Sequence, residues 1–362
     1  MDDWQEFLLN LAAYLVVGGA GILIAATALA TAPYVWRRPL PLPRLRAVRW
    51  SGAIVILAVL TPQVWQVLAA VVVLSLGELW DLITSNAVDP LRESDSLRLM
   101  IHSSPIWIAG TLVVLLGWLC PLSRMTPDQL GLSARRGAAN LVLGVALFLT
   151  VAPVTLAVYY GVIQVTGSKE HDFERLARDG LARWEWPLFV FMTVVGAPLV
   201  EETLFRGIVQ SWLRRASLLG HAVLIIAIAA IGAFPLAAVL WRGTVVQEED
   251  ALAKALAPLA YSALLIGGYV TWLIALKVSR PYPFGRGNGT LRREWANARL
   301  GVYGSAALFA LAHGWPQSVP LFLLGLALGW LALRTQSLIG PMVCHGLFNS
   351  VACLALYWST CS

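Results

Sequence analysis

The chain has 362 residues, of which 58% are hydrophobic and only 13% are charged, with a mean hydropathy of +0.72. Ordinary globular chains are roughly a quarter charged, so this composition excludes a soluble globule. The net charge of +6 does not indicate nucleic-acid binding, because the basic residues are scattered between apolar runs instead of forming one stripe. We therefore expect an integral membrane protein with the lipid bilayer, and no nucleic acid, as its partner.

Apolar runs of about 18 or more residues are long enough to cross a bilayer as helices. The stretch 301–333 contains no Asp, Glu, Lys or Arg, and we divide it because Gly314, Pro316 and Pro320 interrupt helical hydrogen bonding. The prediction is an all-α, polytopic bundle of about ten transmembrane helices, at 8–30, 51–75, 101–121, 138–165, 186–211, 217–241, 255–278, 299–314, 318–334 and 337–358.

The charged residues outside these spans predict how the chain is oriented. Cytoplasmic loops of membrane proteins collect Lys and Arg. If the amino terminus lies outside the cytoplasm, the cytoplasmic segments hold 17 basic and 2 acidic residues, whereas the opposite segments hold 8 basic and 16 acidic residues. This asymmetry predicts a multi-pass protein of the cell (inner) membrane with both termini outside the cytoplasm.

Charged residues well inside a predicted span occur in one segment only, at Glu201, Glu202 and Arg206. A charge within hydrocarbon costs at least about 2.5 to 3.5 kcal/mol, so such residues are usually paired or functional. Glu202 precedes Arg206 by four residues, the favourable order for an ion pair along a helix, and a structural role suits this pair. Glu201 points elsewhere around the helix, which makes it a candidate general base.

Two histidines and an asparagine also fall inside predicted spans. His345 and Asn349 are four residues apart and therefore share one helical face. At 1.5 Å per residue from the cytoplasmic ends, Glu201 lies about 15 Å deep, His313 about 20 Å, and His345 with Asn349 between about 12 and 18 Å. Each polar residue alone is more typical of a hydrogen bond between helices, but the joint pattern favours one site.

Three motifs occur in order: Glu201-Glu202-x-x-x-Arg206, Phe309-x-x-x-His313 and His345-x-x-x-Asn349. This pattern resembles the signature of the CPBP family, also called the Abi family, which includes type II CAAX prenyl endopeptidases and bacteriocin-processing or immunity proteins. Family members generally have a short connection between the first two motifs, whereas here 102 residues separate Arg206 from Phe309.

The resemblance defines an expected domain organisation. It covers a protease-like core at 185–358, interrupted by an inserted pair of helices at about 217–296. The transmembrane helices in 1–184 lie outside the matched region and receive no role.

The resemblance implies an intramembrane endopeptidase that acts on a membrane-embedded or lipidated protein or peptide. In the mechanism proposed for the family, Glu201 and His313 would activate a water, and His345 with Asn349 would stabilise the oxyanion. Glu202 and Arg206 would hold the site in shape. A prenylated CAAX substrate is implied by the resemblance alone.

A metal cofactor is a second expectation that comes with the family, whose members are labelled metalloproteases. Glu201, His313 and His345 could form a three-ligand site for zinc or another divalent metal, with water in the fourth position. A water held only by Glu and His is the alternative, and both stay open from the sequence.

Two other classes of function compete with the protease interpretation. A non-catalytic immunity or assembly factor would use the same helices to bind a partner. A secondary transporter usually shows polar breaks in both halves, whereas here they occur only in the second half, so transport ranks last.

Overall fold

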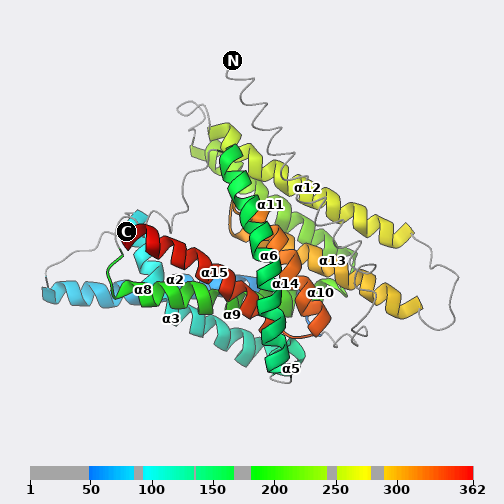
Figure 1. The fold of residues 1–362 in the computed structure, drawn as a ribbon, viewed down its shortest axis with the longest axis horizontal. Helices are drawn as coiled ribbons and strands as arrows, with labels where there is room; N and C mark the ends of the chain where they lie inside the picture. Colours follow the sequence, from blue (N-terminus) through cyan, green and yellow to red (C-terminus); the bar gives the residue numbers. More distant parts are fainter. Residues whose placement is uncertain are drawn as a thin grey trace, which may run out of the picture. The chain divides into compact units, whose positions relative to one another are not determined.

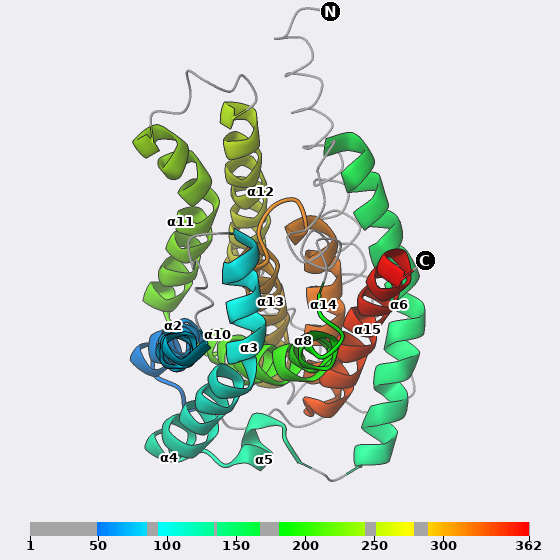
Figure 2. The same ribbon diagram turned by 90° about the vertical axis from the view of Figure 1, so that its left-hand side faces the viewer.

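The computed structural model describes residues 49–84, 93–133, 136–166, 181–242, 251–278 and 289–361. Within these residues every regular element is a helix and no strand occurs (Figures 1 and 2). Eight of the described helical segments are long and apolar enough to cross a membrane, which confirms the predicted all-α, polytopic membrane fold: Gly52–Leu76, Arg98–Leu122, Gly137–Thr166, Glu185–Leu213, Leu218–Trp241, Ala255–Leu276, Ser318–Thr335 and Ile339–Trp358.

The two remaining predicted spans have different outcomes. The span predicted at 8–30 lies outside the described residues. The span predicted at 299–314 is part of the longer helix α13 (Gly289–Ala312), which is not among the eight membrane candidates. Its first half contains four charged residues, Arg292, Arg293, Glu294 and Arg299, which lower its hydropathy.

The predicted break between α13 and α14 (Ser318–Thr335) is confirmed. The helix α13 ends at Ala312, and Gly314 adopts a left-handed φ of 75° that favours glycine. Pro320, which we expected to belong to this break, lies in the first turn of α14, where its missing N–H costs no helical hydrogen bond.

The chain forms two compact units, each built from separate segments. Unit 1 comprises Met1–Arg46, Leu149–Ser168 and Val209–Gln336, and unit 2 comprises Ala47–Phe148, Lys169–Ile208 and Ser337–Ser362. The long helix α6 (Gly137–Thr166) is divided between them. Unit 1 further holds α10 (Gln210–Leu213), α11 (Leu218–Arg242), α12 (Ala251–Val278), α13 and α14.

Unit 2 holds the helices that carry the first and third sequence motifs. Besides the first part of α6, the elements of unit 2 are, in chain order, α2 (Gly52–Thr84), α3 (Glu93–Leu112), η1 (Val113–Leu119), α4 (Cys120–Leu122), α5 (Pro127–Leu130), α8 (Glu185–Val190), η2 (Phe191–Gly196), α9 (Ala197–Glu201), most of η3 (Glu202–Val209) and α15 (Ile339–Cys361). The η segments are π-helical.

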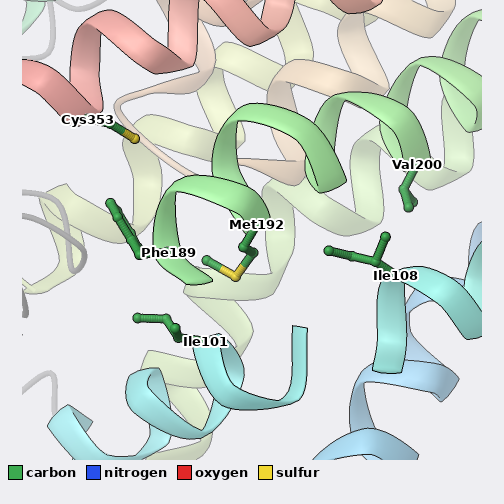
Figure 3. Close-up of a cluster of buried hydrophobic side chains, with 6 residues drawn as sticks. All are labelled: Ile101, Ile108, Phe189, Met192, Val200 and Cys353. Carbon is green, nitrogen blue, oxygen red and sulfur yellow. The ribbon is translucent and has the colours of Figure 1, made fainter. Parts of the chain in front are cut away.

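The core of unit 2 joins three helical segments that are far apart in the sequence. Figure 3 shows side chains from α3, from α8, η2 and α9, and from α15 around one apolar centre, namely Ile101, Ile108, Phe189, Met192, Val200 and Cys353. The α15 backbone comes very close to η2, because a Cβ at Gly346 would lie 2.7 Å from the Val194 carbonyl oxygen. Small residues allow such contacts between membrane helices, and this contact holds α15 against the motif-bearing segment.

Unit 1 has its own core, built around buried aromatic rings on α12, α13 and α14. Tyr303 packs edge-on against Phe322, with the ring centroids 5.2 Å apart, and donates a hydrogen bond to the Leu265 carbonyl. The Gly325-x-x-x-Gly329 pattern of α14 lies against α13, because a Cβ at Gly325 would lie 3.2 Å from Ala306. The helices α13 and α14 therefore pack closely side by side (Figure 1).

Candidate active site

The first motif lies on one continuous helical segment, Glu185–Leu213, half of whose most apolar stretch is buried. The segment contains two π-helical stretches, η2 and η3, and η3 begins at Glu202. π-helical turns are rare and occur often at functional sites, because they displace side chains from the regular helical register. The motif therefore lies where the helix is irregular and surrounded by protein.

The carboxylate of Glu202 joins two basic side chains. Its Oε2 lies 3.2 Å from Nε of Arg206, so the ion pair predicted from the four-residue spacing is present. Its Oε1 lies 2.9 Å from Nδ1 of His345 on α15. The side chains of Glu202 and Arg206 are fully buried and that of His345 is 3% exposed. Within a membrane span such charges persist when they are paired, as these are.

The contact with Glu202 assigns the proton on the His345 ring. An ionised carboxylate only accepts hydrogen bonds, so Nδ1 of His345 must donate to Glu202. The ring is then oriented with Nε2 toward Glu201, whose Oε2 lies 4.0 Å away. Glu201 is the most accessible of these groups, with 23% of its side chain exposed. Glu202 therefore fixes the ring that faces Glu201.

Asn349 is held by a group that the sequence motifs do not reveal. Its Nδ2 donates a hydrogen bond of 2.7 Å to the backbone carbonyl of Thr193 on η2. The Thr193 hydroxyl contacts Sγ of Cys353 at 3.1 Å, one turn further along α15. A carbonyl acceptor exists at every residue, so no side-chain pattern could have indicated Thr193. Thr193 lies within the π-helical η2 stretch.

His313 belongs to unit 1, whereas Glu201, Glu202, Arg206, His345 and Asn349 belong to unit 2. We expected His313 inside a span, but it lies just after the last residue of α13. Its Nδ1 hydrogen-bonds to the carbonyl of Phe309, 2.7 Å away on its own helix, and its ring packs on the Phe309 ring at 4.7 Å. A tautomer that donates from Nδ1 leaves Nε2 as an acceptor.

The predicted metal ligands do not form a complete set within unit 2. Nδ1 of His345 is engaged by Glu202, which leaves one imidazole nitrogen and the Glu201 carboxylate as donors. Catalytic zinc sites usually have three protein ligands. Across the described ranges, no three His, Cys, Asp or Glu side chains are grouped in a way that could hold a metal ion. The unit 2 residues alone thus do not fit a metal centre.

The sequence model of one family, described as type II CAAX prenyl endopeptidase Rce1-like, matches residues 183–280 and 239–351. These ranges contain all three motifs, so the family resemblance predicted from the motifs is confirmed. The two matched ranges overlap around α12, within the extra segment that separates the first motif from the second. Neither a curated protein nor a solved structure matches the chain.

Proposed function

Residues 183–351 match the Rce1-like type II CAAX prenyl endopeptidase family, and from this premise we propose that the protein is an intramembrane endopeptidase. Its substrate is a membrane-embedded or lipidated protein or peptide. The observation that carries the proposal is the buried Glu202 carboxylate, which contacts both Arg206 and His345 and thereby orients the imidazole toward Glu201.

Glu201 is the proposed general base. The distance of 4.0 Å between its Oε2 and Nε2 of His345 exceeds a hydrogen bond and is compatible with a bridging water. A water in that position could transfer a proton to Glu201 while its oxygen attacks the carbonyl carbon of the scissile peptide bond. The Oε2 atom itself is buried, which would shield this water from bulk solvent, while another part of the Glu201 side chain is exposed.

His345 and Asn349 are the proposed oxyanion donors. Asn349 has two amide N–H groups, and only one is needed for the Thr193 carbonyl, so the second can face the substrate. His345 can donate from Nε2 only as the imidazolium. In that form it would make the charges of Glu201, Glu202, Arg206 and His345 sum to zero, which favours their burial.

His313 completes the proposed mechanism as the partner of Glu201, a role that rests on the family resemblance. With its Nδ1 engaged by Phe309, the Nε2 atom could accept a hydrogen bond from the attacking water and orient it, while Glu201 takes the proton that later leaves with the amine. When the tetrahedral intermediate collapses, the carbon–nitrogen bond breaks and the amine leaves with the proton taken from that water. No step of the proposal is assigned to a metal.

The family match also suggests a substrate for testing the proposal. We choose a farnesylated peptide that ends in the CAAX sequence, incubated with the purified, reconstituted full chain. Glu201→Ala and His313→Ala should each reduce cleavage by about 100-fold to 10,000-fold, the usual contribution of acid–base catalysis. Asp128→Asn, which changes an exposed acid on α5, is the matched control and should leave cleavage unchanged.

Cleavage retained by either alanine variant would contradict the mechanism. A non-catalytic immunity or assembly factor would instead show no cleavage by the unmodified chain, and its alanine variants would complement a deletion as well as the parent.

A further inference from the structure

Three arginines of unit 1 lie on or next to helices that contact one another, two of them at helix ends and one in the middle of α13. Arg214 directly follows α10, Arg299 lies on α13, and Arg334 lies in the last turn of α14. The helices α10 and α14 both contact α13 (Figure 1). The three side chains thus come from three different segments of the chain, and none of them belongs to the proposed mechanism.

Two glycine contacts fix the register of these helix ends. A Cβ at Gly301 would lie 2.7 Å from the Gln210 carbonyl oxygen and 3.4 Å from the Arg214 backbone nitrogen. The Gln210 side chain donates a hydrogen bond of 2.9 Å to the carbonyl of Gly329 on α14. Arg214 therefore lies beside the α13 turn that contains Arg299, and the same contacts hold the α14 segment that leads to Arg334.

The three arginines are partly withdrawn from solvent, and each of Arg214 and Arg299 has another arginine beside it. The Arg214 side chain is only 9% exposed. Burial, together with the charge of neighbouring Arg215 and against the opposite effect of Glu294, lowers the pKa of Arg214 to about 10. The positive charges of Arg299 and Arg334 repel each other, and Nε of Arg299 is buried without a hydrogen-bond partner among the described residues.

Acidic residues are scarce in the sequence around this cluster. The segments 210–217, 289–301 and 330–338 contain six arginines and a single acid, Glu294. Arginines that are partly buried beside one another are strained by mutual repulsion, and an anion relieves that strain. The guanidinium group suits phosphate especially well, because it presents parallel N–H donors to two oxygens.

We propose that Arg214, Arg299 and Arg334 bind the phosphate group of an anionic membrane lipid. The charge asymmetry of the loops predicts that these helix ends lie on the cytoplasmic side, where basic pockets between membrane helices bind anionic headgroups. The proposal does not depend on the endopeptidase function.

The test uses the purified full chain in detergent and native mass spectrometry to count bound lipids. Dioleoyl phosphatidylglycerol is the anionic probe, and dioleoyl phosphatidylcholine is the zwitterionic comparison. Each arginine near a membrane surface strengthens anionic-lipid binding about fivefold, so the double variant Arg299→Gln and Arg334→Gln should bind phosphatidylglycerol roughly 25-fold more weakly. The control Arg183→Gln changes an exposed arginine of unit 2 that the loop charges place on the opposite side of the membrane, and it should bind as the parent does.

Two further arms make the result decisive. Arg299→Lys with Arg334→Lys keeps the charge but lacks the paired N–H donors, so it should bind more tightly than the glutamine variant and more weakly than the parent. A glutamine variant whose unfolding midpoint is lower than that of the parent would attribute its loss of binding to folding and overturn the proposal. Soluble glycerol phosphate at the lipid concentration should not displace the lipid. Displacement would assign the site to a phosphate from water and would also overturn it, as would equal binding in the glutamine variant and the parent.

Discussion

Two spans that follow one another in the sequence differ in how much of each is buried in the protein. Half of the most apolar stretch of Glu185–Leu213 is buried, whereas only 17% of that of Leu218–Trp241 is buried, although the second segment is the more apolar. The first segment carries Glu201, Glu202 and Arg206, and the second has no charged residue. In a bilayer, hydrophobicity indicates contact with lipid, and the less apolar helix is the one that protein surrounds. The predictions below test this contrast.

Removing Arg206 should give the largest effect on stability. Arg206→Ala would leave the buried Glu202 carboxylate without its ion-pair partner, which typically costs about 3 to 5 kcal/mol. Phe234→Ala on α11 is the control, because that side chain is 72% exposed, and it should change little. Unfolding midpoints of the reconstituted variants would measure both. Replacing the pair by Glu202→Gln with Arg206→Met should recover part of the loss, and equal midpoints for Arg206→Ala and Phe234→Ala would break the contrast.

A charge placed on the exposed face of α11 should have the next largest effect. Ile226 lies near the middle of the span and is 65% exposed, so Ile226→Arg would present a guanidinium to hydrocarbon. The expected cost of insertion is about 2.5 to 3.5 kcal/mol, and a translocon insertion assay would measure it. Insertion equal to that of the parent helix would show that this face of α11 does not contact lipid.

Adding a methyl group at a glycine should cost stability where another helix lies close by and should cost none where the space is open. A Cβ at Gly346 on α15 would approach the Val194 carbonyl, whereas a Cβ at Gly267 on α12 would meet nothing within 4 Å. Gly346→Ala should therefore destabilise unit 2 by about 1 to 3 kcal/mol. Gly267→Ala should be neutral or stabilising by about 0.5 to 1 kcal/mol, because glycine is unfavourable within a helix. Thermal unfolding would compare them, and equal destabilisation would contradict the close approach of α15 and η2.

Replacing Thr193 should have the smallest effect. Thr193→Val removes the hydroxyl that contacts Cys353 but keeps the backbone carbonyl that accepts from Asn349. A single hydrogen bond of this kind contributes about 0.5 to 1.5 kcal/mol to stability, so cleavage activity should stay close to that of the parent. Activity as low as that of Asn349→Ala would show that the hydroxyl, not the carbonyl, holds the site together.

The sequence predicted the fold well where hydrophobicity alone decides it. The eight described spans correspond to predicted apolar segments, and the break at Gly314 lies where glycine and proline required it. The helix predicted at 299–314 begins ten residues earlier in the structure, at Gly289. The prediction started it at Arg299 because only the residues after Arg299 lack charge, and the charged residues before it were assigned to a loop.

The candidate site was only partly predictable. The spacing of Glu202 and Arg206 indicated their ion pair because both lie on one helix, where spacing determines contact. The contact of His345 with Glu202 joins residues 143 positions apart, and its geometry depends on how α15 packs against the η2–α9 region. The π-helical turns and the Thr193 carbonyl have no signature in the residue types, so they appear only in the structure.

The central claim is that Glu201 removes the proton from the attacking water. Single-turnover cleavage of the farnesylated CAAX peptide by Glu201→Gln tests it most directly, with peptide binding measured separately on the same preparation. The glutamine keeps the size of the side chain but cannot act as a base at neutral pH. We predict that Glu201→Gln binds the peptide as tightly as the parent and cleaves it at least about 100-fold more slowly. Cleavage at the parent rate would contradict the claim.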